Sequence, residues 1–196
     1  KNINITIPAK STIGFVGSTG SGKTTTVDII LGLLEPQNGT LEIDGKIITN
    51  QNVRAWQKSI GYVPQHIFLS DDTIASNIAF GVDKKKIDQK AVESASKIAS
   101  LHEFVMNELH KNYETKIGER GIRLSGGQRQ RIGIARALYH KPKILILDEA
   151  TVNIDESVEE NIILNMKKLF PDTTILAVSH RNSLKKFADK FLELGK

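Results

Sequence analysis

The stretch Gly17-Ser18-Thr19-Gly20-Ser21-Gly22-Lys23-Thr24 decides the fold of this chain. It has the pattern typical of a phosphate-binding loop: a glycine, four free positions, then Gly-Lys-Thr. Glycines lack a Cβ, so the backbone can turn sharply and aim successive N–H groups at one anion. Lys23 can add positive charge near the β- and γ-phosphates of a nucleotide, and the Thr24 hydroxyl can bind Mg²⁺. The stretch therefore predicts a nucleotide site.

The residues on either side of the loop supply the context that such a loop needs. Before it, residues 13–16 (Ile-Gly-Phe-Val) are apolar enough for a short buried strand. After it, one apolar helix face repeats at i, i+3, i+4 and i+7, formed by Val27, Ile30, Leu31 and Leu34. Glu35-Pro36 is expected to end this helix. The order of strand, loop and helix makes a chance glycine-rich turn the weaker interpretation.

Composition limits the class of protein. The 196 residues suit one globular domain, with 39% hydrophobic and 25% charged residues. Without cysteine, a disulfide framework and a thiolate metal site are excluded. No apolar run reaches the roughly 20 residues of a membrane span, and no signal-peptide pattern opens the chain.

The charge balance alone does not indicate a function. There are 27 Lys and Arg against 22 Asp and Glu, a net charge of +5. A basic stripe interleaved with aromatic side chains would favour nucleic acid, but the sequence shows none, and Lys84-Lys85-Lys86 is most simply a solvated turn. We expect a solvated surface with phosphate-binding positions, and no nucleic acid partner.

Strand patterns occur near both ends of the chain. Six segments are predicted to be strands: residues 3–7, 12–16, 60–65, 144–147, 174–178 and 191–194. The continuous apolar run at 144–147 is typical of a parallel strand covered on both faces. Asp44-Gly45 between two short runs predicts a hairpin, and hence a small antiparallel sheet beside the parallel one.

Helical patterns occupy the middle. From Asp72 to about Tyr139 the apolar spacing is helical throughout, and Thr73 and Asp88 are expected N-caps. Another helix is expected to start at Asp155, because acidic residues open it and lysines close it.

These elements predict an α/β fold, a P-loop ATPase core with a parallel sheet, a small antiparallel subsheet and an inserted all-helical subdomain. The RecA-like core would comprise residues 1–66 and 140–196, and the helical subdomain residues 67–139. The chain enters a strand pattern almost at once, so we expect that N- and C-terminal parts of the full domain are missing.

Two adjacent carboxylates close the apolar strand at Leu147-Asp148-Glu149. Open α/β folds bind ligands at the carboxyl ends of their strands. Asp148 is suited to hold Mg²⁺, directly or through water, and Glu149 to polarise the water that attacks a γ-phosphate. The alternative, in which Asp148 caps the next segment and Glu149 is solvated, loses weight because a phosphate loop lies upstream.

Leu124-Ser125-Gly126-Gly127-Gln128 precedes a predicted helix. Ser125 is a favourable N-cap, and Gly126 and Gly127 keep the N-terminus of that helix free of side chains, which suits a second anion site. Taken alone, the stretch would be interpreted as an ordinary helix cap.

Five elements, in this order and at these intervals, resemble the nucleotide-binding domain of ATP-binding-cassette (ABC) transporters: Gly17–Thr24, Gln65, Leu124–Gln128, Ile144–Glu149 and His180. The resemblance covers essentially the whole chain. Many ATPases and GTPases share a phosphate loop, whereas Leu-Ser-Gly-Gly-Gln is the signature of this family.

The resemblance implies ATP and Mg²⁺ as cofactors and ATP hydrolysis as the activity. Catalysis would use Glu149, His180 and Gln65, and the metal would lie at Thr24, Gln65 and Asp148. The nucleotide would be bound by Gly17, Ser18, Thr19, Gly20, Ser21, Gly22, Lys23, Thr24, Thr25, Ser125, Gly126, Gly127 and Gln128.

The resemblance also implies how two copies share a site. Gln65 would approach Mg²⁺ and the attacking water, and its loop would touch a membrane domain. His180 would contact the γ-phosphate, while Ser125 and Gly127 would bind the γ-phosphate held by the phosphate loop of a second nucleotide-binding domain. A head-to-tail homodimer with two ATP molecules bound at its interface is therefore expected.

Two stretches, residues 72–81 and 115–121, resemble exporter-type domains, in which a transmembrane domain precedes this one in the same polypeptide. The second is similar to the exporter segment that contacts the membrane domain of the partner. Multidrug exporters and flippases of lipid-linked oligosaccharides belong to this branch, and we favour a glycan flippase. The implied location is the cytoplasmic face of a membrane, a bacterial inner membrane.

The chain departs from the family pattern in three places. Val152-Asn153-Ile154-Asp155 replaces Ser-Ala-Leu-Asp, which removes a serine that helps to bridge the two domains and predicts weaker communication between sites rather than lost dimerisation. Gly133 stands where alanine is more frequent. The aromatic residue that stacks on adenine lies upstream of residue 1 in the family.

Two alternatives stay open. A soluble cassette ATPase acting on DNA or ribosomes shares these motifs, but its DNA-repair members carry a long coiled coil that this sequence lacks. A module that dimerises on ATP without cleaving it would be expected to lose Glu149 or His180, and both are present. Only kinetics would decide whether the chain cleaves ATP or dimerises on it without turnover.

Overall fold

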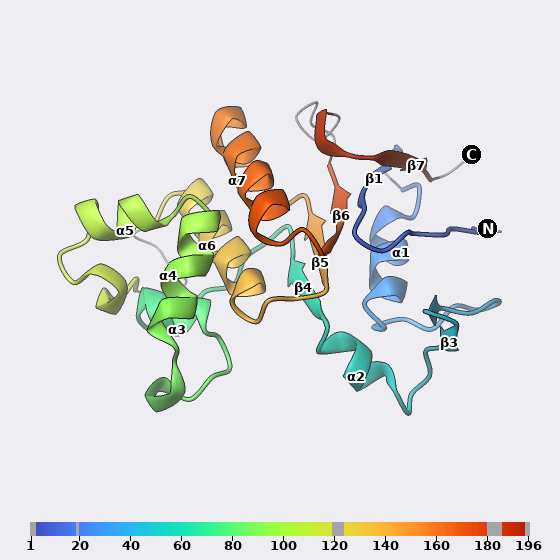
Figure 1. The fold of residues 1–196 in the computed structure, drawn as a ribbon, viewed down its shortest axis with the longest axis horizontal. Helices are drawn as coiled ribbons and strands as arrows, with labels where there is room; N and C mark the ends of the chain where they lie inside the picture. Colours follow the sequence, from blue (N-terminus) through green and yellow to red (C-terminus); the bar gives the residue numbers. More distant parts are fainter. Residues whose placement is uncertain (1–2, 19, 119–123, 180–185, 195–196) are drawn as a thin grey trace. The chain divides into compact units, whose positions relative to one another are not determined.

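The computed structural model describes residues 3–18, 20–118, 124–179 and 186–194, and Figure 1 shows its helices and strands. The chain divides into two compact units. The first contains Lys1–Tyr62, Pro142–Asp148 and Asp172–Lys196, and the second contains Val63–Lys141 and Glu149–Pro171.

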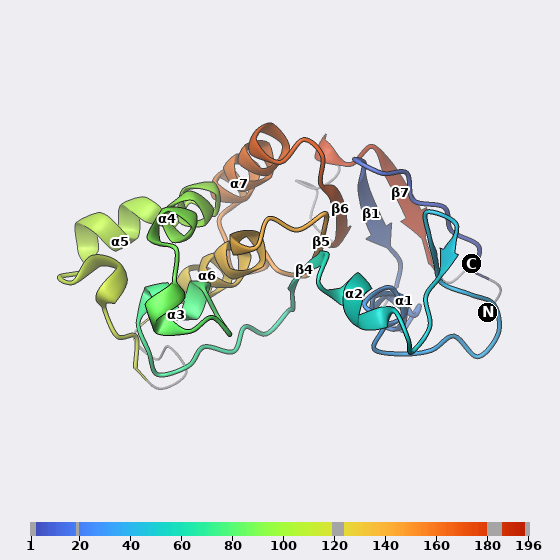
Figure 2. The same cartoon turned by 60° about the horizontal axis from the view of Figure 1, so that its bottom comes forward.

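A five-stranded sheet with the order β4-β5-β6-β1-β7 forms the centre of the first unit. Its strands are β1 (Thr12–Val16), β4 (Ile60–Val63), β5 (Ile144–Asp148), β6 (Thr174–Val178) and β7 (Lys190–Glu193). β1 pairs in parallel with β6 on one side and with β7 on the other, and β1 and β7 lie side by side in Figures 1 and 2. β5 is parallel to β6. The predicted fold class is confirmed.

The core of this unit explains why these strands form. β5 and β6 are buried over nearly their whole length, as expected for parallel strands covered on both faces. This unit includes α1 (Lys23–Ile30), which packs against β5, and α2 (Val53–Gln57). The buried cluster includes Phe15, Val27, Trp56, Ile146 and Leu176.

The predicted hairpin is present. β2 (Glu42–Ile43) and β3 (Lys46–Ile47) pair antiparallel as a separate two-stranded sheet. Asp44 and Gly45 have φ angles of 50° and 76°, so both central residues of the turn have the positive φ that a type I′ turn requires.

Two sequence predictions about this unit are wrong. Residues 3–7 do not form a strand, and they cannot pair with β1, because both edges of β1 are already paired with β6 and β7. The helix after the phosphate loop ends at Ile30 and not near Pro36. A Schellman motif ends it: the Gly32 N–H donates to Ile29 O and the Leu33 N–H to Asp28 O, both at 2.9 Å, with Gly32 at φ 67°.

Helices make up most of the second unit. They are α3 (Ile74–Ile78), α4 (Gln89–Ile98), α5 (His102–Glu108), α6 (Gly126–Tyr139) and α7 (Glu156–Leu169), with 3₁₀ turns at Lys84–Lys86 and Asn112–Glu114. The predicted N-caps are confirmed: Thr73 accepts from the Ser76 N–H, and Asp88 from the Lys90 and Ala91 N–H groups. Asp155 is the N-cap residue of α7.

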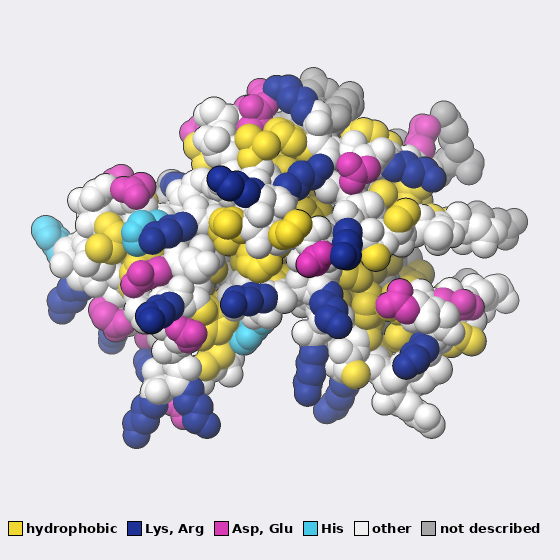
Figure 3. Space-filling view, in the orientation of Figure 1, with side chains coloured by type: hydrophobic (Ala, Val, Ile, Leu, Met, Phe, Trp, Pro, Cys, Tyr) yellow, Lys and Arg dark blue, Asp and Glu magenta, His cyan; other side chains and the backbone are white. Residues whose placement is uncertain are grey.

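The predicted bounds of the core and of the helical subdomain stay a prediction. The two compact units divide the chain differently, since Glu149–Pro171, which contains α7, is grouped with Val63–Lys141. Among the described residues, no helix has both the length and the apolar character to cross a membrane. On the face drawn in Figure 3, Lys and Arg side chains are spread among acidic and uncharged ones and do not form one stripe.

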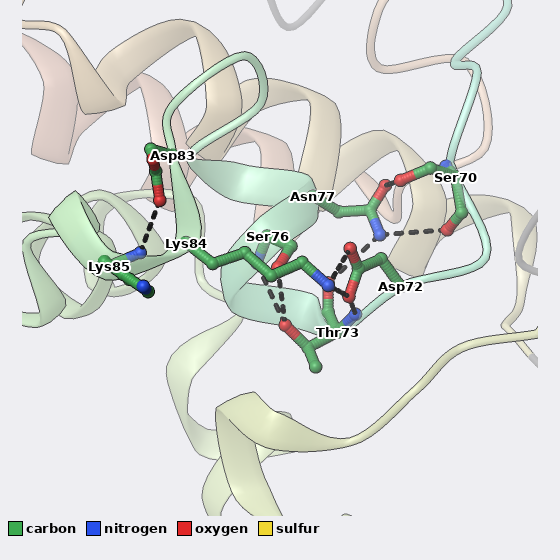
Figure 4. A network of polar contacts seen from close by, with 8 residues as sticks. All are labelled: Ser70, Asp72, Thr73, Ser76, Asn77, Asp83, Lys84 and Lys85. Carbon is green, nitrogen blue, oxygen red and sulfur yellow. Dashed lines mark hydrogen bonds and ion pairs between the residues drawn. The ribbon is translucent and has the colours of Figure 1, made fainter.

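A polar network anchors α3 (Figure 4). The Asn77 side chain is fully buried, and its Nδ2 donates to Ser70 O and Thr73 O, both at 3.0 Å. Its Oδ1 accepts from the Ser70 N–H at 2.9 Å. Asp72 receives Lys84 Nζ at 2.7 Å and also accepts from the Thr73 N–H. A buried amide with these partners satisfies its hydrogen-bonding groups and defines one position for the segment before α3.

The Gly133 departure has a packing reason. A Cβ added at Gly133 on α6 would lie 2.5 Å from Ile67 Cδ1 and 2.9 Å from Ile67 Cγ1. Glycine in a helix interior costs about 0.5–1 kcal/mol relative to alanine. In this chain the missing methyl group makes room for Ile67.

Candidate functional site

The phosphate loop connects β1 to α1 within the first unit. Gly17 approaches its neighbours so closely that an added Cβ would lie 2.6 Å from both Leu194 O and Ser21 Oγ. Gly22 is the N-cap of α1 with φ 93°, in the left-handed region that favours glycine. The loop therefore depends on glycine for close packing at its start and for backbone conformation at its end.

Lys23 and two threonines occupy the first turn of α1. The Lys23 side chain is nearly buried, with 9% exposure, and its Nζ donates to Gly17 O at 2.7 Å and to Ser18 O at 2.8 Å. These bonds satisfy a buried ammonium and hold its charge over the loop at the positive end of α1. Thr24 and Thr25 are exposed. Thr19 lies outside the described residues.

The residues present fit a nucleotide with Mg²⁺. Ser21 Oγ is buried without a hydrogen-bond partner among the described residues, which suits a loop that receives an anion. The same described part of the chain has no group of three or more His, Asp or Glu side chains that could hold a metal ion. Mg²⁺ commonly binds through one or two protein oxygens together with phosphates, and Thr24 and Asp148 offer such oxygens.

Asp148 ends β5 in the first unit and has a partner that the sequence analysis missed. The Tyr62 hydroxyl on β4 donates to Asp148 Oδ2 at a long 3.4 Å. Burial, then the charges of Asp148 and Asp28, raise the pKa of Tyr62 to about 12. The phenol therefore stays protonated at neutral pH and can donate. The only sequence signal was an aromatic residue with a polar tip near the end of a strand.

We expect Tyr62→Phe to raise the Mg²⁺ concentration that half-saturates ATP hydrolysis about three- to tenfold. The change removes one hydrogen bond that orients Asp148, and such outer contacts typically change metal affinity about 10–100-fold, with the long distance favouring a smaller effect. The affinity for Mn²⁺ in the presence of ATP, measured by electron paramagnetic resonance, reports the same metal site without turnover.

The matched control is Tyr139→Phe, which removes the hydroxyl that accepts from the Asp88 N–H at 3.0 Å in the second unit. Equal Mn²⁺ affinities for Tyr62→Phe and the unmodified chain would contradict the role of Tyr62.

Glu149 and Gln65 meet in the second unit. Gln65 Nε2 donates to Glu149 Oε2 at 2.7 Å, although 84 positions separate the two residues in the sequence. The backbone of Glu149 has φ 49°, a left-handed conformation that non-glycine residues rarely adopt and that is frequent at functional sites. The two residues predicted to act on the attacking water are thus brought together.

The signature stretch begins α6 in the same unit. Ser125 Oγ accepts from the Gln128 N–H at 3.1 Å, and Gln128 Oε1 accepts from the Ser125 N–H at 2.8 Å. This reciprocal pair is a capping box. It confirms Ser125 as the N-cap. Gly126 and Gly127 then occupy the first turn of α6, at the positive end of the helix dipole.

The structure therefore describes the predicted site in two parts. The first unit carries the phosphate loop and Asp148, and the second carries Gln65, Glu149 and Ser125–Gln128. His180 lies outside the described residues, as do Glu119-Arg120-Gly121 of the second exporter-like stretch. The roles of the individual residues stay predictions.

Comparison with known proteins gives consistent matches. A family model described as "ABC transporter" matches residues 1–152. An ATP-dependent lipid A-core flippase of Saccharophagus degradans is 43% identical over 190 residues, which are 97% of this chain and 32% of that protein. ATP-binding cassette sub-family B member 5 of Mus musculus is 41% identical over 189 residues, 96% of this chain and 15% of that protein.

A solved structure of a bacterial Atm1-family ABC exporter with ATP bound superposes with a TM-score of 0.89 at 35% identity, covering 96% of this chain and 32% of that one. The chain thus spans about a third or less of the length of the proteins it matches. Since the family model covers most of the chain, and each of these proteins aligns with nearly all of it, the chain belongs to the ABC transporter family and corresponds to the ATP-binding domain of its exporters.

Proposed function

We propose that this chain binds and hydrolyses Mg²⁺-ATP as the nucleotide-binding domain of an ABC exporter or flippase. The observation that carries the proposal is the phosphate loop, in which the nearly buried Lys23 ammonium is held over the carbonyls of Gly17 and Ser18 at the N-terminus of α1. A fixed positive charge beside a helix N-terminus is suited to the phosphates of a nucleotide.

Each group would contribute one part of the chemistry. The loop N–H groups and Lys23 would bind the phosphates, while the Thr24 hydroxyl and Asp148 would hold Mg²⁺, which supplies positive charge at the phosphate oxygens. Glu149 would accept a proton from the attacking water, and Gln65, bonded to it at 2.7 Å, would orient its carboxylate. His180 would contact the γ-phosphate.

Two copies of the chain would complete each site. The first turn of α6 presents Ser125 and two glycines, which suit the γ-phosphate held by the phosphate loop of a second copy. The dimer would be head to tail, so that one copy alone has half of each site. Val152, which is 47% exposed in place of the family's serine, would weaken communication across the seam.

A transmembrane domain in the same polypeptide is the expected further partner, because the matched proteins are about three or more times as long as this chain and two of them are named as an exporter or a flippase. We place the domain at the cytoplasmic face of a membrane, a bacterial inner membrane, with a lipid-linked glycan as the favoured substrate class. These names do not favour an ATPase that acts on DNA or ribosomes.

Phosphate release from Mg²⁺-ATP at several protein concentrations tests this proposal. We expect the rate per chain to rise with protein concentration, because hydrolysis needs two copies, and to vanish in Lys23→Ala. Release at a constant rate per chain would contradict the shared site. ATP binding without any release would instead support a module that dimerises without turnover.

A further inference from the structure

The segment that follows Glu149 makes two tight turns before α7. The Val152 N–H donates to Glu149 O at 3.4 Å, and the Ile154 N–H donates to Thr151 O at 2.9 Å. Ala150 and Ile154 are buried, with 2% and 4% exposure. Residues 150–154 therefore have a defined conformation, and they follow Glu149 directly in the chain.

Three side-chain hydrogen bonds between described residues of the second unit contribute to holding this segment. Gln65 donates to Glu149, and Thr151 Oγ1 donates to Glu159 Oε1 on α7 at 2.5 Å, with both partners buried. The third bond comes from α6, where Gln130 Oε1 accepts from the Asn153 N–H at 2.8 Å. Gln130 is five positions after the N-cap Ser125 and is only 3% exposed.

The backbones of the segment and of the signature turn are in direct contact around this bond. A Cβ added at Gly127 would lie 2.7 Å from Asn153 O, and one added at Gly126 would lie 3.1 Å from Asn153 Cβ. Such distances leave no space for a side chain at Gly127 unless the backbone moves. The two glycines thus allow the close approach, and the buried Gln130 side chain fixes it by a partly buried hydrogen bond.

We propose that Gln130 is a positioning residue for ATP hydrolysis. By accepting the Asn153 N–H, Gln130 joins the segment that begins with Glu149 to α6. A shift of the first turn of α6 when nucleotide binds at Ser125 would therefore change the position of the Glu149 carboxylate. This inference rests on the proposed function, since it assigns Glu149 and Ser125 their roles there. Packed elements transmit small shifts in this way because they have few alternative arrangements.

The test uses Gln130→Met, which keeps the length of the side chain but removes the acceptor. We expect kcat for ATP to fall about tenfold, because a displaced catalytic group loses rate steeply, while KM for ATP stays within about twofold. Dimerisation on Mg²⁺-ATP, measured in a Glu149→Gln background, is expected to stay within about threefold.

A double-mutant cycle with Ser125→Ala measures the coupling itself. If Gln130 links the two regions, the combined loss of kcat is smaller than the product of the two single losses. Gln89→Met makes the same chemical change on α4, where the side chain is exposed, and should leave kcat unchanged. If Gln130→Met does not fold, Gln130→Asn replaces it, since its amide is one methylene too short to reach Asn153.

The outcomes separate this inference from the proposed function. If the unmodified chain neither dimerises on ATP nor releases phosphate, the proposed function fails. If it does both, two results would overturn the inference. One is an unchanged kcat in Gln130→Met; the other is a double variant with Ser125→Ala whose loss of kcat equals the product of the two single losses. Either result would make Gln130 a packing residue only.

Discussion

Glu149→Gln is expected to leave ATP binding unchanged and to reduce turnover at least about 100-fold, the lower range for removal of a general base. The amide has the size of the carboxylate and can still accept from Gln65 Nε2, which lies 2.7 Å from Glu149 Oε2 in the unmodified chain. It cannot take up the proton of the attacking water. Binding of a fluorescent ATP analogue and phosphate release measure the two properties separately.

Glu156→Gln is the matched control, because it neutralises an exposed carboxylate in the first turn of α7, in the same unit. Its turnover should equal that of the unmodified chain. Turnover of Glu149→Gln within about threefold of the unmodified value would remove Glu149 from the mechanism. The Gln65 hydrogen bond would then be a structural contact only.

Ser125→Arg is expected to abolish the ATP-dependent dimer. The substitution removes the hydroxyl that caps α6 and places a long side chain where two glycines leave the helix N-terminus open. Light scattering of the Glu149→Gln chain, with and without Mg²⁺-ATP, measures it: the mass should double with ATP, and the Ser125→Arg form should stay a monomer.

Ser125→Arg also removes a helix cap, which costs roughly 1 kcal/mol of folding stability. A control must separate this loss of stability from the loss of nucleotide binding by Ser125. Asp88→Ala removes the cap of α4, where the carboxylate accepts from the Lys90 and Ala91 N–H groups at 2.9 and 3.2 Å. It should lower stability by a similar amount and still dimerise. A Ser125→Arg chain that dimerises normally would show that the signature turn does not face a partner's nucleotide.

The sequence alone determined the elements whose signals are local. The phosphate loop, the Asp44-Gly45 hairpin and the N-caps at Thr73, Asp88 and Ser125 were all predictable, because each depends on residues within a few positions of one another. The buried run at 144–147 predicted a parallel central strand for a similar reason.

Two predictions from local signals were wrong, for different reasons. Residues 3–7 alternate like a strand, yet pairing depends on which strand edges in the sheet are available, and both edges of β1 are occupied by β6 and β7. The end of α1 has a local signal, Gly32, which lies four positions before the Pro36 at which the helix was predicted to end. The Schellman bonds at Gly32 decided the end of the helix.

Only the tertiary structure decided which side chains meet across long sequence separations. Gln65 with Glu149, Tyr62 with Asp148, and Gln130 with Asn153 are pairs 84, 86 and 23 positions apart. No period or spacing predicts such pairs, because their contacts are set by how strands and helices pack after they form. The sequence therefore predicted the chemical groups of an ATP site, while the packing of β4 against β5, and of α6 against residues 149–155, decided how those groups are held.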